Sequence, residues 1–226
     1  MLRFMGPEAS ATFAGTEAIA VSPLPGICSP YYTSTALVNV AQIQAALVRA
    51  SRAAPVAGGP ECAAVAVIVR DTNAGAEVLL IRRAQRLGDP WSGHIGLPGG
   101  RWEPADRTLT DTAVRETLEE VGLDLANSGA LLGPLPAIPA VGRGLKKRLT
   151  IAPYVFATSA VQRCRLNEEV AAVLWVPLDT LVDPSHAATI DHETDGEVRT
   201  LPAWTVEGRV VWGLTYAMLR SLLSLL

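Results

Sequence analysis

Apolar and polar positions along the first part of the chain show both helical and strand spacing. Apolar side chains recur every three or four residues over 35–53, which predicts a helix that ends before Pro55. The apolar run 62–69 predicts a buried strand, and 77–83 predicts its hairpin partner beyond a polar turn. Residues 84–100 are rich in glycine and proline and predict a loop.

The second part of the chain continues this mixture. The pattern predicts a helix from Thr108 to Val121, capped by Asp106 or Thr108 and ended by Gly122. Further elements are expected as strands at 130–138, 149–157 and 170–176, a short helical turn opening 177–184, a strand or hairpin over 198–212, and a C-terminal helix over 213–226. This order predicts an α/β or α+β fold.

The composition fits a globular protein and excludes some classes. The chain has 226 residues, of which 49% are hydrophobic, so it can bury a sizeable core without disulfides or a structural metal. Its three cysteines form no CxxC pair, which is typical of a reducing compartment, and we expect the protein to be cytoplasmic. A formal charge of −3 excludes a strongly basic protein that coats nucleic acid.

The N-terminal region differs from the rest of the chain. No charged residue lies between Glu17 and Arg49, but prolines and hydroxyl side chains interrupt this stretch. These interruptions argue against a membrane-spanning helix and against a signal peptide. We expect residues 1–33 to be a poorly ordered leader and residues 34–59 to form a helix and a linker, with no membrane partner.

Negative charge is concentrated in one segment, residues 101–124, which contains seven acidic and three basic residues. On the helix predicted there, Glu116, Glu119 and Glu120 fall within a sector of about 100°. The opposite side is expected to face the core and contains Val114, Leu118 and Val121. A solvated acidic face is the simpler interpretation. The alternative is a site for Mg²⁺ or Mn²⁺, which prefer oxygen ligands.

The segment before this helix favours the cation site. In Leu97-Pro98-Gly99-Gly100, two glycines let the backbone turn sharply and approach a ligand closely. With the helix, the string is Gly100-x5-Asp106-x8-Arg115-Glu116-x2-Glu119-Glu120-x-Gly122-Leu123. It resembles the Nudix hydrolase signature GX5EX7REUXEEXGU. Thr117 replaces an aliphatic residue, and the first acid is Asp106, with one extra residue before Arg115.

A finer resemblance is to the coenzyme A pyrophosphatase-like branch of this family, whose members carry approximately FPGG…DPxD…TAxREtxEEvG. Here the string is LPGGRWEPADRTLTDTAVRETLEEVG. Gly93 also matches that branch, whereas Asp89 stands where the branch has a basic residue. The branch is also similar to this chain at residues 167–170 and 175–178. The resemblance covers residues 60–226, which we expect to form one Nudix hydrolase domain, an α/β/α sandwich with a mixed central sheet.

The resemblance implies hydrolysis of the pyrophosphate bond in a nucleoside diphosphate linked to another group, with Mg²⁺ or Mn²⁺ as cofactor. It implies that Glu116, Glu119 and Glu120 are the metal ligands and that Arg115 holds Glu116 in position. Glu116 could also help to deprotonate water, and Glu169 or Glu168 is expected as a more distant base or metal ligand. Substrate contacts are expected from Gly99, Gly100, Arg82, Arg83 and His94, although a structural hydrogen bond explains a loop histidine equally well.

Several alternatives stay open from the sequence. Coenzyme A or a derivative is the first expected substrate, and an ADP-ribose or dinucleoside polyphosphate hydrolase is the alternative. A nucleotide-sensing Nudix module without activity is less favoured, because all three carboxylates are present. Trp91, Trp102 and Trp204 could stack on a base, but packing in the core or at its rim is the default for such residues. The expected partner is a small nucleotide, not a nucleic acid, and a homodimer is left open.

Overall fold

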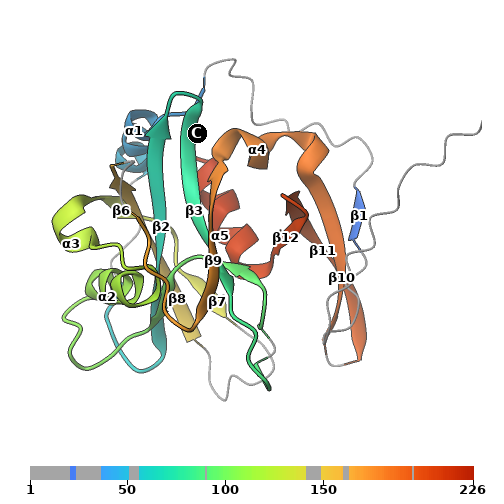
Figure 1. Ribbon diagram of the computed structural model, residues 1–226, viewed down its shortest axis with the longest axis horizontal. Coiled ribbons are helices and arrows are strands. Elements are labelled where there is room, and N and C mark those ends of the chain that lie inside the picture. The colour runs from blue at the N-terminus through green and yellow to red at the C-terminus, as the bar shows by residue number, and fades with distance from the viewer. Residues whose placement is uncertain are drawn as a thin grey trace, which may run out of the picture.

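The structure is a computed structural model that describes residues 21–23, 37–50, 56–89, 91–140, 149–159, 163–194 and 196–226. Within these residues, a mixed eight-stranded sheet forms the centre of the molecule (Figure 1). Its strands are β2 (Cys62–Thr72), β3 (Gly75–Arg83), β4 (Ile95–Gly96), β5 (Gly99–Arg101), β6 (Gly129–Pro134), β7 (Ile138–Ala140), β8 (Leu149–Thr158) and β9 (Val170–Pro177). β2 and β8 are parallel, whereas β2 pairs with β3 and β5 in the antiparallel sense.

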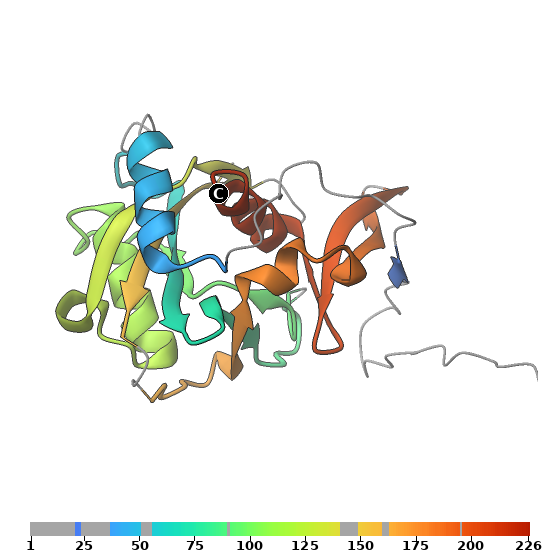
Figure 2. The same ribbon diagram turned by 90° about the horizontal axis from the view of Figure 1, so that it is seen from above.

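Helices cover both faces of this sheet. They are α1 (Val40–Ala50), α2 (Leu109–Val121), α3 (Leu125–Ser128), α4 (Leu178–Val182) and α5 (Gly213–Leu223). Successive side chains of a strand point to opposite faces. Ala66 and Ile68 of β2 therefore pack in one core with α2, and Val67 and Val69 pack in the other with α1 and α5. Figure 2 shows these layers, which confirm the predicted α/β/α sandwich. In the described part of the chain, no helix has both the length and the apolar character needed to cross a membrane.

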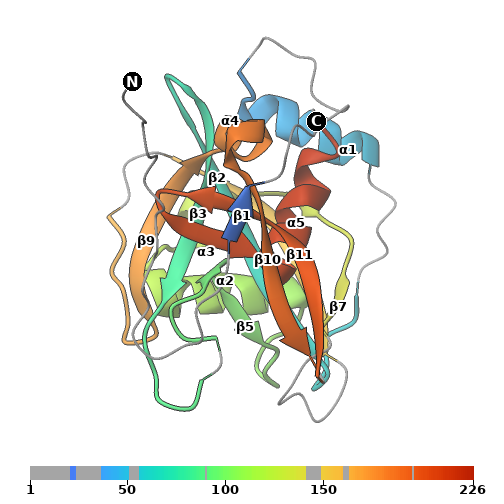
Figure 3. The same ribbon diagram turned by 90° about the vertical axis from the view of Figure 1, so that its right-hand side faces the viewer.

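A second, four-stranded sheet packs beside the first within the described residues. It has the order β1-β10-β11-β12 and is antiparallel. Its strands are β1 (Val21–Pro23), β10 (Ala187–Thr194), β11 (Glu197–Val206) and β12 (Arg209–Trp212). A short 3₁₀ helix, Pro184–His186, lies directly before β10. α5 lies between the two sheets in Figures 1 and 2, and Figure 3 shows β1 beside β10.

The structure corrects several predicted boundaries. The strand predicted at 130–138 is two strands, β6 and β7, and the loop predicted over 84–100 contains β4 and the start of β5. Within the helix predicted over 35–53, α1 covers Val40–Ala50 and residues 37–39 precede it without helical structure, while 35–36 and 51–53 lie outside the described residues. β10 was missed because Asp191, His192 and Glu193 interrupt its apolar signal. The predicted leader, residues 1–33, lies outside the described residues except for β1.

Candidate active site

Both ends of α2 follow from its local sequence. The Thr108 side chain accepts a hydrogen bond from the Asp111 backbone N–H at 3.1 Å, and the Asp111 carboxylate accepts one from the Thr108 N–H at 3.1 Å. This reciprocal pair is a capping box, which satisfies N–H groups that a helix start leaves unpaired. At the other end, Gly122 adopts φ 70°, a left-handed conformation that glycine takes without steric cost. Thr108, rather than Asp106, is thus the N-cap.

The buried face of α2 differs in part from the one that its apolar residues predict. Leu118 is 49% exposed, whereas Glu120 is only 4% exposed. The small side chains of Ala113 and Thr117 are fully buried, which lets the helix pack closely against the sheet. Leu118 lies about 160° around the helix from Glu120, so it faces outward when Glu120 faces inward. The prediction is therefore wrong for Leu118 and Glu120, whereas Val121 is fully buried as expected and Glu119 stays on the exposed side.

Arg115 binds the acidic residues together. Its guanidinium donates to both oxygens of Asp106, at 3.0 Å each, and to the carboxylates of Glu116 at 3.0 Å and Glu119 at 3.3 Å. A further bond at 3.0 Å reaches the Arg101 carbonyl oxygen. The hydrogen bonds with Asp106 raise the pKa of Arg115. The Arg115–Glu116 contact agrees with the position that the sequence led us to expect.

Asp106 is the fixed end of this network. It is 7% exposed and also accepts hydrogen bonds from the Glu103 N–H at 3.0 Å and the Thr112 hydroxyl at 2.8 Å. The hydrogen bonds from Arg115 lower the pKa of Asp106 to about 2. The extra residue before Arg115 therefore does not prevent the first acid of the motif from reaching the arginine.

The two glycines bring the loop against both β2 and α2. A Cβ on Gly99, which has φ 152°, would overlap the Ala64 carbonyl oxygen and the Val65 Cα. Without one, Gly99 lies against β2, and its N–H donates to a carboxylate oxygen of Glu120 at 2.9 Å. A Cβ on Gly100 would overlap the Glu116 carboxylate. Gly99 therefore needs to be glycine, whereas a side chain at position 100 would displace the Glu116 carboxylate.

Burial changes the electrostatics of two of the carboxylates. It raises the pKa of Glu120 to about 7, even though the Gly99 N–H favours the charged form. It also raises the pKa of Glu116, against the opposing effect of Arg115. Because burial makes negative charge unfavourable here, a cation beside these groups would relieve an electrostatic penalty.

The donor set suits a hard divalent cation. Glu116, Glu119 and Glu120 supply three carboxylates within about one helical turn, and the absence of a side chain at Gly100 leaves a cradle beside Glu116. Over the described ranges, no three His, Cys, Asp or Glu side chains are gathered closely enough to hold an ion. In this structure Arg115 engages two of the carboxylates, and the Gly99 N–H engages the third.

The other predicted site residues differ in whether they interact with the carboxylates. Arg83 and Glu169 both act electrostatically on Glu120, so the fold brings them to the site. Arg83 also forms an ion pair with Asp89 at 3.0 Å, and its Nε is buried without a hydrogen-bond partner among the residues that the structure describes. The buried Nε of Arg82 likewise has no partner in the described structure. Nothing in the described contacts connects Arg82 with the carboxylates.

The three tryptophans considered for base stacking differ in their surroundings. Trp102 donates its Nε1–H to the Asp106 carbonyl oxygen at 3.0 Å. Trp204 is 4% exposed, and its ring centroid lies 4.2 Å from that of Tyr216. Both are therefore part of the packed structure. Trp91 is 44% exposed and lies beside His94.

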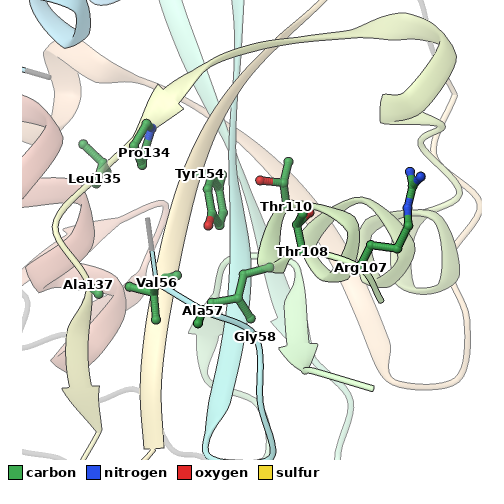
Figure 4. A pocket seen from close by; sticks show the side chains of 12 residues that line it. Val56, Ala57, Gly58, Arg107, Thr108, Thr110, Pro134, Leu135, Ala137 and Tyr154 are labelled. Atoms are coloured by element: carbon green, nitrogen blue, oxygen red, sulfur yellow. The ribbon is translucent and has the colours of Figure 1, made fainter. Parts of the chain in front are cut away.

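A cavity of about 370 Å³ lies at the first turn of α2, the end away from Glu120 (Figure 4). Its lining includes Val56, Thr108, Leu135 and Tyr154. It shares no residue with the predicted site. The chemistry expected from the sequence is therefore placed outside this cavity.

Comparison with known proteins identifies the family. Residues 60–195, more than half of the chain, match the family model described as the NUDIX domain. The chain belongs to the NUDIX family. This finding confirms the Nudix resemblance expected from the Gly100–Leu123 motif.

Three similar proteins illustrate the range of this Nudix family. An uncharacterized protein of Schizosaccharomyces pombe is 36% identical over 63% of this chain, which spans only 45% of that relative. The human mitochondrial coenzyme A diphosphatase NUDT8 is 31% identical over 74% of this chain and 70% of its own length. The crystal structure of the Nudix hydrolase RenU from M. smegmatis is 25% identical over 55% of this chain and 75% of that chain, with a TM-score of 0.47. The family match and the similarity to the human coenzyme A diphosphatase support the predicted class, a Nudix pyrophosphohydrolase.

Sequence analysis missed one charged partner near the Nudix site. Arg86 donates to Glu169 at 3.0 Å and to Glu168 at 3.3 Å. Arg86 and Glu169 are 83 residues apart in the chain, so no local spacing pattern could have linked them. Only the position of Glu169 just before β9, which pairs with β3, brings the two together.

Proposed function

We propose that this protein hydrolyses the pyrophosphate bond of a nucleoside diphosphate linked to another group. The observation that carries the proposal is the Arg115-anchored set of carboxylates on α2, held against the Gly99–Gly100 loop. A densely anionic pyrophosphate can approach such a site only with cations between the two. Glu116, Glu119 and Glu120 would hold Mg²⁺ or Mn²⁺, which neutralises phosphate charge and makes bound water more acidic.

The residues around the carboxylates have distinct parts in this proposal. Arg115, itself fixed by Asp106, positions Glu116 and Glu119. Glu116 or Glu169 accepts a proton from the attacking water. The water oxygen then bonds to phosphorus, and the bond between phosphorus and the bridging oxygen breaks. Gly99 and Gly100 let the phosphates approach the backbone closely. Arg83, with its unpartnered Nε, offers a positive group to the departing phosphate.

Coenzyme A or a derivative is the substrate that we propose first. The support is the PGG-centred sequence pattern and the similarity to the human coenzyme A diphosphatase. ADP-ribose or a dinucleoside polyphosphate is kept as the second candidate, because Asp89 stands where the coenzyme A pyrophosphatase-like branch has a basic residue. The cytoplasmic location stays a prediction. The sequence leaves open whether the protein is a monomer or a homodimer.

The metal assignment predicts that Glu119→Gln and Glu120→Gln each abolish turnover. Glutamine keeps the shape, and its carbonyl oxygen can still accept from the Gly99 N–H, so circular dichroism should show an intact fold. The matched control is Glu197→Gln, at an exposed residue on β11, which should hydrolyse at the wild-type rate. Wild-type hydrolysis by both α2 variants, measured on a verified substrate with Mg²⁺ or Mn²⁺, would show that the assignment is wrong.

The substrate is decided by product identification. Coenzyme A, ADP-ribose, NADH and diadenosine polyphosphates are incubated with the protein and Mg²⁺ or Mn²⁺, and products are identified by mass. Coenzyme A cleavage gives 3′,5′-ADP and 4′-phosphopantetheine. Release of AMP from ADP-ribose, with coenzyme A left intact, would replace the first candidate by the second. Binding without product for every compound would favour the sensing module.

A further inference from the structure

Four aromatic rings meet beside the glycine-rich loop. Trp91 and His94 come from the segment before β4, His192 from β10, and Trp212 from the end of β12. The Trp212 ring centroid lies 4.9 Å from that of His192, 5.3 Å from that of His94 and 6.5 Å from that of Trp91. Trp91 and His94 are 5.6 Å apart. These four residues, here called the Trp–His cluster, join the small sheet to the loop.

The Trp–His cluster leaves aromatic surface open. Trp91 is 44% exposed, which is unusual for a side chain that buries so much apolar area when packed. It meets His94 edge-on, with an interplanar angle of 83°, and it is tilted by 43° from Trp212. No ring of the cluster therefore stacks flat on Trp91. Trp204 shows the contrast, since it is 4% exposed and packs in the core.

The fold holds this open surface in place. Trp212 packs against the buried residues Ala188, Ile190 and Ala203 of the small sheet. The Thr215 hydroxyl donates to the Ile95 carbonyl oxygen at 3.1 Å and so ties α5 to the residue that follows His94. A surface fixed in this way loses little entropy when a flat ligand stacks on it.

Arg83 connects the Trp–His cluster with the carboxylates of α2. Its backbone N–H donates to the His94 carbonyl oxygen at 3.0 Å. Its guanidinium donates to Asp89 at 3.0 Å, and the other oxygen of Asp89 accepts from the Trp91 N–H at 3.0 Å. On the other side, Arg83 acts electrostatically on Glu120. One residue thus borders both the anionic site and the rings.

We propose that the Trp–His cluster is where the aromatic base of the nucleotide stacks, with Trp91 as the main contact. The proposal rests on the proposed function and deepens it, because it places the nucleoside half of the substrate toward β10 and β12. Arg83, which donates its N–H to His94 and acts electrostatically on Glu120, links the phosphate end of this arrangement with the rings. Stacking is tolerant of base identity because every base has a flat π face.

Binding of AMP tests this proposal without relying on hydrolysis, because AMP has no pyrophosphate bond. Calorimetry compares the wild type, Trp91→Leu and Trp91→Phe. Leucine keeps apolar bulk but removes the ring, so we expect the AMP Kd to rise about ten- to a hundredfold. Phenylalanine keeps a ring and should stay within about threefold of the wild type. Ribose 5-phosphate, which lacks the base, should bind all three proteins equally.

Two results would overturn the base site. One is unchanged AMP binding by Trp91→Leu, and the other is an equal loss of ribose 5-phosphate and AMP binding. Trp212→Leu provides a second variant, with its fold checked by circular dichroism, and should also weaken AMP binding selectively. Failure of the proposed hydrolysis would appear separately, as the absence of product in the substrate screen. Calorimetry would still measure base-dependent AMP binding by a protein that has no turnover.

Discussion

At the scale of single residues, Asp106 shows how a departure from a motif is accommodated. In the sequence, Asp106 stands where the motif has a glutamate, with one extra residue before Arg115. The sequence left two roles open for it, the N-cap of the helix and the first acid of the motif. The structure buries it and gives it hydrogen bonds from the Arg115 guanidinium, the Thr112 hydroxyl and the Glu103 N–H. A carboxylate with this many donors is strongly stabilised in its charged form.

Asp106→Asn is therefore expected to destabilise the protein and to reduce its activity. The pKa of Asp106 is about 2 in the fold, against an ordinary value of 3.8, so its charge contributes about 2 kcal/mol. This contribution is fully present above about pH 4 and is lost as the pH falls toward 2. Urea unfolding at pH 7 and pH 3 should show a smaller difference between variant and wild type at pH 3. A difference that is equal at both pH values would contradict the ion-pair explanation, and Glu197→Gln serves as control.

At the scale of elements, the limits of α2 were predicted, but its buried face was predicted only in part. The capping residues Thr108 and Gly122 act locally, so the sequence suffices to locate both ends of the helix. Which face is buried depends on what the helix packs against. Here the Gly99 N–H draws Glu120 inward, and Leu118 is left outside.

The orientation of α2 predicts unequal effects for two apolar substitutions. Val121→Ala should lower the free energy of unfolding by about 1–3 kcal/mol, because Val121 is fully buried in the core that α2 shares with the sheet. Leu118→Ala should change it by less than about 0.5 kcal/mol, since a side chain that is about half exposed loses little packing. Chemical denaturation of both variants measures the difference. A larger loss for Leu118→Ala would contradict the observed burial, in which Val121 faces the core and Leu118 does not.

At the scale of the whole molecule, the two sheets share one hydrophobic core. Val67 and Leu80 of the large sheet belong to the same buried cluster as Trp204 and Val206 of β11 and Leu219 of α5. Because α5 packs between the sheets, neither sheet can lose its packing without exposing side chains of the other.

We therefore expect the two sheets to unfold together. Native-state hydrogen exchange should give the same free energy of opening for the most protected amides of β2 and of β11. An opening free energy for β11 lower by about 2 kcal/mol or more would show that the small sheet unfolds on its own. Trp204→Leu offers a further check, since loss of this buried ring should reduce protection in both sheets.

The sequence alone determined the Nudix motif, the ends of α2 and the glycine loop, because capping, turns and motif spacing depend on neighbouring residues. Tertiary structure decided which α2 face is buried, how Arg86 meets Glu169 and where the Trp–His cluster forms. These contacts join segments distant in the chain, such as Trp91 with Trp212. Strand pairing and shared burial select which residues meet. A local pattern of polar and apolar residues contains no information about either.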